Sequence, residues 1–388
     1  MSTPAHDALI VGGGPVGCAA ALALADAGMS VTVLEAHAPG QRAPDSRTLA
    51  LSWNSRLILE RLAAWSDDLR ATPIRTIHVS HRGRFGRACL STDDVQLPAL
   101  GYVVRFSSVY DALQARAQEL AIDYRYGFKV SKIDHGRPLC QVSGATVQGV
   151  ETLQARLVVI ADGGASLTQS VTKNVHEYDY AQIAVVGLVR PDRPHGNRAY
   201  ERFTPNGPIA LLPCEDEFAF VWTCTAQQAD SLSALDDHAF LARLRSAFGD
   251  RAGRFIEVRL RSSFPLSLRV AGERADSGVV LLGNASQTLH PIAGQGFNLG
   301  LRDAWDLAEV VRSALPGEIG SPSMTSRFRA LRRVDRAGGI AVTHALAGLF
   351  SNDFPPVALG RGIGLVMLDA LPPLKRELMR RMIFGVGS

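Results

Sequence analysis

The chain has 388 residues, of which 46% are hydrophobic and 20% are charged. This composition excludes a mainly disordered chain, and the length predicts two or three domains. The 41 Lys and Arg residues against 37 Asp and Glu residues give a formal net charge of +4. That excess is too small to indicate a nucleic-acid-binding protein.

The cysteines and the N-terminus indicate where the protein resides. Five cysteines, an odd number with no Cys-x-x-Cys pair, predict no disulfide framework and favour a reducing cytoplasm. The N-terminus has no basic region before its first apolar run, so we expect no signal peptide. The sequence also has no apolar run long enough for a transmembrane helix.

A strand, a glycine-rich turn, a helix and a second strand are predicted at the N-terminus. Residues 8–11 form a continuous apolar run, as expected for a strand buried on both faces. Three glycines and a proline follow, and residues 16–27 are then rich in alanine and leucine. Gly28 suits the end of this helix, and the β-branched residues 30–34 predict the next strand. This order indicates a βαβ unit.

Two later segments are also apolar and end in small residues. Residues 155–160 lead into Ala-Asp-Gly, and residues 277–282 lead into Gly-Asn. Strands of an open α/β sheet end in this way when a ligand lies beyond their carboxyl ends. We therefore expect both segments to join the first strand in one sheet, which makes the nucleotide-binding domain discontinuous.

The remaining chain divides into a β-rich insert and a helical end. Residues 176–270 contain apolar β-leaning runs separated by turn formers, which predicts a mostly antiparallel sheet. Residues 320–388 predict helices interrupted at two Pro-Pro pairs. The fold class is therefore α/β, a Rossmann-like domain with an inserted, mainly antiparallel β-sheet substrate domain and a helical C-terminus. The expected boundaries are 1–75, 100–175 and 275–318 for the nucleotide-binding domain, 76–99 and 176–274 for the substrate domain, and 319–388 for the C-terminal helical region.

The glycines Gly12, Gly14 and Gly17 have the spacing of a dinucleotide-binding fingerprint. Such glycines permit a tight turn and close approach of a pyrophosphate to a helix N-terminus. Glu35 lies at the end of the second predicted strand, where a carboxylate accepts a hydrogen bond from a ribose hydroxyl. The fingerprint alone does not distinguish NAD from FAD.

A second segment, residues 283–304, favours a flavin. It is dense in small and turn-forming residues and then becomes an amphipathic helix. Backbone N–H groups at such a helix start can face a ring carbonyl or the negative charge of a reduced cofactor.

These motifs resemble those of the single-component FAD-dependent aromatic hydroxylases. The glycine fingerprint, Ile160-Ala161-Asp162-Gly163 and the segment 283–304 occur in the family's order. Gly283-Asn284-Ala285, followed by Gln287-Thr288-Leu289-His290-Pro291, is most similar to the ubiquinone-biosynthesis branch, and within it to the 2-octaprenyl-6-methoxyphenol hydroxylases. The wider family mostly has Asp at the position of Asn284, whereas the ubiquinone-biosynthesis branch also has Asn there.

The resemblance implies a role for several residues. Glu35 would bind the adenosine ribose, and Arg47 would lie near the pyrophosphate and the flavin edge. Asp162 and Gly163 would lie near the pyrophosphate and be linked to binding of the reductant. The residues implied to hold or border the flavin are Asn284, Pro291, Gly294, Gln295 and Gly296. His290 is a candidate for a direct proton role, with a structural role beside the flavin as the alternative.

The resemblance also implies an activity. NAD(P)H would reduce FAD, the reduced flavin would combine with dioxygen to a C4a-hydroperoxide, and its distal oxygen would attack a phenol ring. The expected substrate is a polyprenyl-methoxyphenol hydroxylated para to its hydroxyl, which yields the 1,4-benzoquinol in ubiquinone biosynthesis. No base for the phenol can be chosen from the sequence.

Two alternatives remain open at this point. The enzyme could hydroxylate another ring position or another aromatic compound. The chain could instead be a non-catalytic flavin-binding subunit of a quinone-biosynthesis complex, because the family usually has an acidic or amide pair where this chain has Arg105-Phe106.

Two further features have ordinary interpretations beside functional ones. His78 and His81 with Cys89 could suggest a metal, but the segment lacks a fourth ligand of standard spacing, so we expect surface or loop histidines and no metal. Residues 357–384 combine apolar and basic side chains. They could contact the cytoplasmic face of a membrane peripherally, or they could pack on the protein's own domains with solvated charges.

Overall fold

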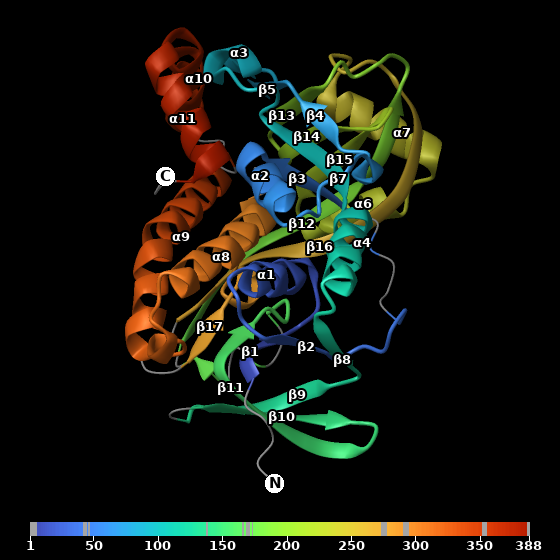
Figure 1. Cartoon of the computed structure of the whole chain (residues 1–388). Coiled ribbons are helices and arrows are strands. Elements are labelled where there is room, and N and C mark those ends of the chain that lie inside the picture. Colours follow the sequence, from blue (N-terminus) through green and yellow to red (C-terminus); the bar gives the residue numbers. More distant parts are fainter. Residues whose placement is uncertain are drawn as a thin grey trace.

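The structure is a computed structural model of the chain. It describes residues 6–41, 45, 47–136, 139–164, 167, 171–172, 174–272, 278–289, 295–350 and 355–385. Figure 1 shows the sheet that contains the first strand in the lower half of the molecule and a larger sheet in the upper half, with the C-terminal helices along one side.

The lower sheet has seven strands in the order β8-β2-β1-β11-β10-β9, and β17 also pairs with β11. Strands β8, β2, β1, β11 and β17 are mutually parallel neighbours, whereas β9, β10 and β11 form an antiparallel meander. The strands are β1 (His6–Val11), β2 (Val31–Glu35), β8 (Asp123–Tyr126), β9 (Lys129–Asp134), β10 (Cys140–Thr146), β11 (Gly149–Ile160) and β17 (Val279–Leu281). The prediction that three distant segments share one sheet is confirmed.

Helix α1 (Pro15–Asp26) is buried against this sheet along almost its whole length. It begins at Pro15, whose fixed φ suits a first helical residue and whose missing N–H costs no hydrogen bond there. Gly28, with a φ of +85°, lets the chain leave the helix. The helix is alanine-rich because it packs between β2, helix α4 (Phe106–Glu119) and helix α8 (Gln295–Arg312).

A small sheet lies between the two large ones. It consists of β3 (Thr48–Ser52), β7 (Gly101–Arg105) and β4 (Thr72–Ile74), all antiparallel to their neighbours. Helix α2 (Trp53–Arg61) follows β3 directly, with the Ser52 hydroxyl accepting a hydrogen bond from the N–H of Ser55 as its N-cap. Figure 1 shows this small sheet between α8 and the upper sheet.

The upper sheet has eight strands in the order β18-β16-β12-β15-β14-β13-β5-β6, and its one parallel pair is β13 with β5. Helices α6 (Ala226–Ser233) and α7 (Asp237–Phe248) cover one face over a core that includes Phe218, Phe220 and Phe240. Its strands are β5 (Thr76–His81), β6 (Arg87–Ser91), β12 (Val175–Pro191), β13 (Arg198–Thr204), β14 (Gly207–Cys214), β15 (Glu217–Cys224), β16 (Phe255–Ala271) and β18 (Gln287–Thr288). This mainly antiparallel insert was expected, while the exact domain boundaries stay a prediction.

Three helices complete the chain, and two of them begin at the predicted Pro-Pro pairs. They are α9 (Pro322–Phe350), α10 (Pro355–Ala370) and α11 (Pro372–Phe384). Helix α11 buries Met379 and Ile383 against Leu90 and Leu100. Lys375 is also buried, and its Nζ lies 2.9 Å from Asp94 Oδ2 in helix α3 (Thr92–Val95). Within the described residues, no helix is both long enough and apolar enough to cross a membrane.

The expectation of surface or loop histidines at 78 and 81 is wrong. Both side chains are buried, because they belong to β5, which lies between β13 and the edge strand β6 of the upper sheet. Three residues apart in a strand, they point to opposite faces and cannot share a metal ion. Among the described residues, no group of three His, Cys, Asp or Glu side chains is arranged to hold one.

A buried ion network joins α8 to α9. Arg332 Nε donates to Asp303 Oδ1 at 2.7 Å, and Arg332 NH1 donates to Asp306 Oδ2 at 2.7 Å. Asp335 Oδ2 accepts from Arg302 Nε at 2.9 Å and lies 2.9 Å from Arg332 NH2. Burial lowers the pKa of Arg332, but the three carboxylates outweigh it, so the net pKa lies above the ordinary value. The guanidinium is therefore charged, and the neighbouring carboxylates compensate its charge.

We expect Arg332→Met to destabilise the protein by about 3–5 kcal/mol, because it leaves buried carboxylates without their counter-charge. Urea unfolding followed by circular dichroism measures this loss. The matched control is Arg333→Met, whose side chain is exposed one residue further along the helix. Equal stability of the two variants would contradict the role assigned to the network.

Candidate functional site

Four neighbouring parallel strands end at the same edge of the lower sheet. The chain leaves β1 at Gly12, β2 ends at Glu35, β11 leads to Asp162, and β17 leads to Gly283. Because the strands are parallel, their carboxyl ends meet at one edge. The structure thus brings together the three sequence motifs, which lie as far apart as residues 12 and 283 in the chain.

The turn after β1 is too tight for side chains. A Cβ atom on Gly12, which has a φ of +103°, would come within 2.6 Å of the Ala161 carbonyl oxygen. A Cβ on Gly17 would come within 1.9 Å of the Gly12 carbonyl oxygen. Gly14 is the N-cap of α1 and offers no side chain to cap the first turn. The first N–H groups of α1 therefore remain for an anion, as the fingerprint predicts.

Glu35 is held at this edge by hydrogen bonds to both carboxylate oxygens. Oε2 accepts from the Gly13 N–H at 2.8 Å, and Oε1 accepts from the N–H and Nδ1 of His37 at 3.0 and 2.7 Å. Burial raises the pKa of Glu35, but these hydrogen bonds outweigh it and hold the net pKa below the ordinary value. The carboxylate is ionised, and Oε2 has a further lone pair for a ribose hydroxyl.

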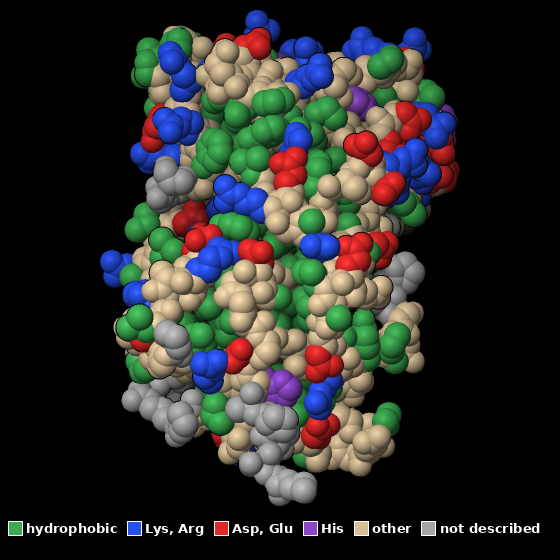
Figure 2. Space-filling model, in the orientation of Figure 1, with side chains coloured by type: hydrophobic (Ala, Val, Ile, Leu, Met, Phe, Trp, Pro, Cys, Tyr) green, Lys and Arg blue, Asp and Glu red, His purple; other side chains and the backbone are tan. Residues whose placement is uncertain are grey.

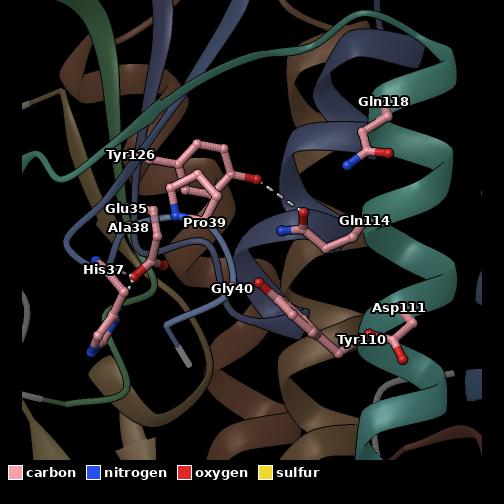
Figure 3. Close-up of a pocket in the computed structure, with 10 residues that line it drawn as sticks. All are labelled: Glu35, His37, Ala38, Pro39, Gly40, Tyr110, Asp111, Gln114, Gln118 and Tyr126. Atoms are coloured by element: carbon pink, nitrogen blue, oxygen red, sulfur yellow. Dashed lines mark hydrogen bonds and ion pairs between the residues drawn. The ribbon is translucent and has the colours of Figure 1, made fainter. Parts of the chain in front are cut away.

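A pocket of about 280 Å³ opens beside Glu35. Figure 3 shows it between the loop that follows β2, with Pro39 and Gly40, and the side chains of Tyr110 and Gln114 from α4. Tyr126 at the end of β8 closes one side, and its hydroxyl donates to Gln114 Oε1 at 3.2 Å. No local pattern of residues indicated this wall, because it is contributed by α4 and β8.

The motif after β17 packs directly on the start of α1. Cβ atoms on Gly283 and Gly300 would come within 3.2 and 2.7 Å of Val16 methyl groups. The Gly283 N–H donates to Asp303 Oδ2 at 3.2 Å, which links this loop to the ion network of α8 and α9. The Asn284 side chain is exposed to solvent.

Asn298 is a positioning residue that the sequence analysis did not single out. Its Oδ1 accepts from the Ser52 N–H at 2.8 Å and from Ser55 Oγ at 2.6 Å, and its Nδ2 donates to the Ala50 carbonyl at 2.9 Å. It is 2% exposed, so these bonds form away from water and fix the start of α8 against β3 and α2. Its polar nature within an otherwise apolar stretch of helix is the signal that could have identified it.

Arg47 immediately precedes β3. Its guanidinium pairs with Asp45 at 2.5 Å and lies 5.3 Å from the centre of the Phe106 ring. The hydrogen bonds that Arg47 donates to Asp45 raise the pKa of Arg47 above its ordinary value. Arg105, on the atypical flank, ends β7 and donates through Nε to Glu215 Oε1 at 2.8 Å, so it joins the small sheet to the insert. The position of Arg47 near the pyrophosphate and the flavin edge stays a prediction.

The remaining predicted residues divide into two groups. His290, Pro291 and Gly294 lie outside the described residues. Gln295 and Gly296 begin α8, and the Gln295 amide donates to the Met382 carbonyl at 3.4 Å. A Cβ on Gly163 or Gly296 would meet no atom of the described residues within 4 Å.

Comparison with known proteins shows the family. The sequence family described as "FAD binding domain" matches residues 5–333. "Ubiquinone hydroxylase UbiL" of Rhodospirillum rubrum is 36% identical over 96% of this chain and 88% of its own length. The chain belongs to this family of FAD-dependent hydroxylases. A second relative, "3-demethoxyubiquinol 3-hydroxylase" of Escherichia coli, is 30% identical over 98% of this chain and 99% of its own length.

Solved structures confirm the fold. The crystal structure of p-nitrophenol 4-monooxygenase PnpA from Pseudomonas putida has a TM-score of 0.79 over 98% of this chain and 99% of its own, at 20% identity. A Klebsiella pneumoniae HpxO structure with FAD and uric acid has a TM-score of 0.74 over 96% of this chain and 97% of its own, at 16% identity. The expected aromatic-hydroxylase fold is thus confirmed.

The chain is an NAD(P)H- and FAD-dependent monooxygenase, and the residues present fit the cofactor. The side-chain-free turn at Gly12 and Gly14 and the uncapped start of α1 suit a pyrophosphate. The ionised Glu35 beside a pocket suits the ribose and its base. We propose that these residues hold FAD, with Asp162 and Asn284 at the neighbouring strand ends.

We expect Glu35→Ala to weaken FAD binding about 10- to 100-fold, because a charge-assisted hydrogen bond is worth about 1.5–3 kcal/mol. Fluorescence titration of the apoprotein with FAD measures this loss. The control is Glu119→Ala, since that carboxylate is exposed at the far end of α4. Unchanged affinity in Glu35→Ala would remove Glu35 from the cofactor site.

Proposed function

We propose that the protein hydroxylates a polyprenyl phenol in ubiquinone biosynthesis. The observation that carries this proposal is the 36% identity to a ubiquinone hydroxylase over 96% of the chain. The site supports it, because all three cofactor motifs end at one edge of one sheet and form a single binding region. A plain nicotinamide dehydrogenase would leave the third motif, packed on α1, without a purpose.

The finer proposal is hydroxylation of 2-octaprenyl-6-methoxyphenol para to its hydroxyl, which gives the 1,4-benzoquinol. A phenol ring is electron-rich at this position, so an electrophilic oxygen attacks it most easily. The second candidate is another ring position. It is favoured by the relative named as a 3-hydroxylase, which matches 98% of this chain at 30% identity.

Bound FAD would supply the redox chemistry, with NAD(P)H as the electron source and dioxygen as the oxidant. The protein's own residues bind and orient. The start of α1 fixes the pyrophosphate, Glu35 fixes the ribose, and Asn298 and Asp303 hold α8 and the Gly283 loop in register. The insert sheet extends to this loop through β16, where the Ala271 N–H donates to the Ser286 carbonyl at 2.9 Å. Substrate enclosed between insert and cofactor would be shielded from water.

We expect a strain that lacks this gene to lose ubiquinone and to accumulate the unhydroxylated phenol, which lipid extraction with mass spectrometry identifies. The wild-type gene restores the quinone, and Gly14→Trp does not, because the indole would fill the pyrophosphate turn. Gln295→Ala is expected to restore it in part. Accumulation of a methoxylated quinol that lacks one hydroxyl elsewhere would assign the other ring position, and an unchanged quinone pool would refute the function.

We also propose that the C-terminal helices contact the cytoplasmic face of a membrane, where a polyprenyl phenol resides. One side of α10 and α11 exposes apolar side chains, which are Leu359, Ile363, Val366, Met367, Leu371 and Leu374. The basic Arg376 and Arg380 are exposed beside them. Figure 2 shows hydrophobic and basic side chains together over these helices. This combination suits an anionic lipid surface. A partner protein of a ubiquinone-biosynthesis complex is the alternative occupant.

We expect Met367→Glu to bind vesicles of phosphatidylglycerol and phosphatidylcholine about tenfold more weakly than the wild type in a flotation assay, since an apolar contact is lost and a repelled charge is added. The control is Val150→Glu, because Val150 is also exposed to solvent but lies on the β10–β11 hairpin of the lower sheet. Binding that is equal in both variants, or absent in the wild type, would contradict membrane contact.

A further inference from the structure

Glu201 is a carboxylate on an inner strand of the upper sheet. It lies on β13, opposite Ala210 of β14 and opposite Val79 of β5. The register continues this row across the sheet, from Ala210 to Val221 of β15 and on to Val186 of β12. Every neighbour of Glu201 in this row is therefore apolar.

The side chains beside Glu201 in the strand define the face on which it lies. Tyr200 packs edge-on against Phe248 of α7, and the Arg202 guanidinium lies 5.9 Å from the centre of the same ring. Since side chains alternate along a strand, Glu201 lies on the face away from α7. Ala199, which shares that face, packs with Val103 of β7.

That face is turned toward the cofactor-binding half of the molecule. The small sheet, which covers it at Ala199 and Leu188, is fastened through β3 to the start of α8 by the hydrogen bonds of Asn298. Figure 1 shows the small sheet in this intermediate position. Glu201 thus lies in the layer where insert and cofactor domain meet.

The row of Glu201 is less completely covered than the rows on both sides of it. Val79, Ala210, Val221, Val186 and Glu201 itself are all partly exposed. On one side Ala199 and Ala219 are buried, and on the other side Phe203 and Thr223 are buried. The row is therefore a narrow apolar strip with one carboxylate, inside the layer where the insert and the cofactor domain meet.

Within the described part of the chain, the Glu201 carboxylate makes no hydrogen bond or ion pair. Burial alone raises the pKa of Glu201 to about 7. The charged groups on the surrounding elements do not offset this rise in pKa. Glu217 on β15 is paired with Arg259 of β16. His81 on β5 and Arg361 on α10, the helix that packs on β5 and β6, contribute nothing to the shift.

Such a carboxylate has no evident use for the fold. An unpaired acid in a mostly apolar layer destabilises a protein by the cost of its desolvation, and an apolar side chain would fit this row better. Groups of this kind in native proteins call for a functional explanation. The apolar strip suits an aromatic ring, and the carboxylate suits a hydroxyl on that ring.

We infer that Glu201 is the catalytic base that accepts the proton of the substrate's phenol hydroxyl. The inference rests on the proposed function, because it requires a phenolic substrate. The O–H bond of the phenol breaks, its electron pair stays on the phenolate oxygen, and the proton forms a new O–H bond on the Glu201 carboxylate. After oxygen transfer the ring loses the proton of the attacked carbon to solvent, and Glu201 returns its proton to the phenolic oxygen.

This transfer increases the reactivity of the ring. A neutral phenol has a pKa of about 10, so it is almost wholly protonated near neutral pH in water. A carboxylate with a pKa of about 7 is ionised above neutral pH and is a stronger base than an ordinary glutamate. The phenolate that results donates electrons to the para carbon more strongly than the phenol does.

The test uses the FAD-loaded full chain and a methoxyphenol with a short prenyl chain as the probe. The ultraviolet difference spectrum of the bound probe reports its ionised fraction, and a single-turnover assay reports the hydroxylation rate. In Glu201→Gln we expect the ionised fraction and the rate to fall at least about tenfold, with FAD content unchanged. Glu201→Asp should recover part of both, because it keeps a carboxylate on a shorter side chain.

The control is Glu257→Gln on β16, an exposed carboxylate paired with Arg190. The wild-type rate should rise with pH through about 7, and this rise should disappear in Glu201→Gln. If the bound probe is ionised to the same extent in Glu201→Gln as in the wild type, the role of Glu201 is overturned, while the proposed function is not. A wild type that takes electrons from NAD(P)H but neither ionises nor hydroxylates the phenol would overturn the proposed function and, with it, this inference.

Discussion

The close approach of α1 to the ends of β1 and β11 is the constraint on which the rest of the structure depends. A single Cβ on Gly17 would lie 1.9 Å from a backbone oxygen, and one on Gly12 would lie 2.6 Å from another. Only glycine permits this contact, and the contact directs the free N–H groups of the helix to the edge where the other strands end. The cofactor site and the position of α8 against α1 both follow from it.

Buried polar groups then hold in place the segments that the glycines allow to approach one another. Asp303 accepts from the Gly283 N–H and from Arg332, and Asn298 bonds to β3 and α2. These bonds form in low dielectric, where a missing partner is costly, so they hold distant segments in one arrangement. Glu201 is the exception, since it lies in an apolar row and has no partner among the described residues, and this contrast makes it a candidate for chemistry instead of architecture.

The family resemblance and the geometry answer different parts of the functional question. The relatives show an FAD-dependent monooxygenase, and two of them are named for ubiquinone hydroxylation. Similarity of this kind does not select a ring position or a base. Those depend on how a phenol lies against the insert sheet. The proposals for Glu201 and for the apolar side of α10 and α11 therefore arise from this chain's own geometry and not from the relatives.

The sequence by itself determined the nucleotide-binding βαβ unit, the shared sheet of three distant strands, the antiparallel insert and the helix breaks at the Pro-Pro pairs. Each depends on local signals, such as glycine spacing, apolar runs and proline, that act over a few residues. Only the tertiary structure decided that His78 and His81 are buried on opposite faces, that α4 and β8 wall the pocket at Glu35, and that Glu201 has apolar neighbours. These properties come from strand register and from packing between segments that are distant in the chain, and no local pattern of residues encodes either.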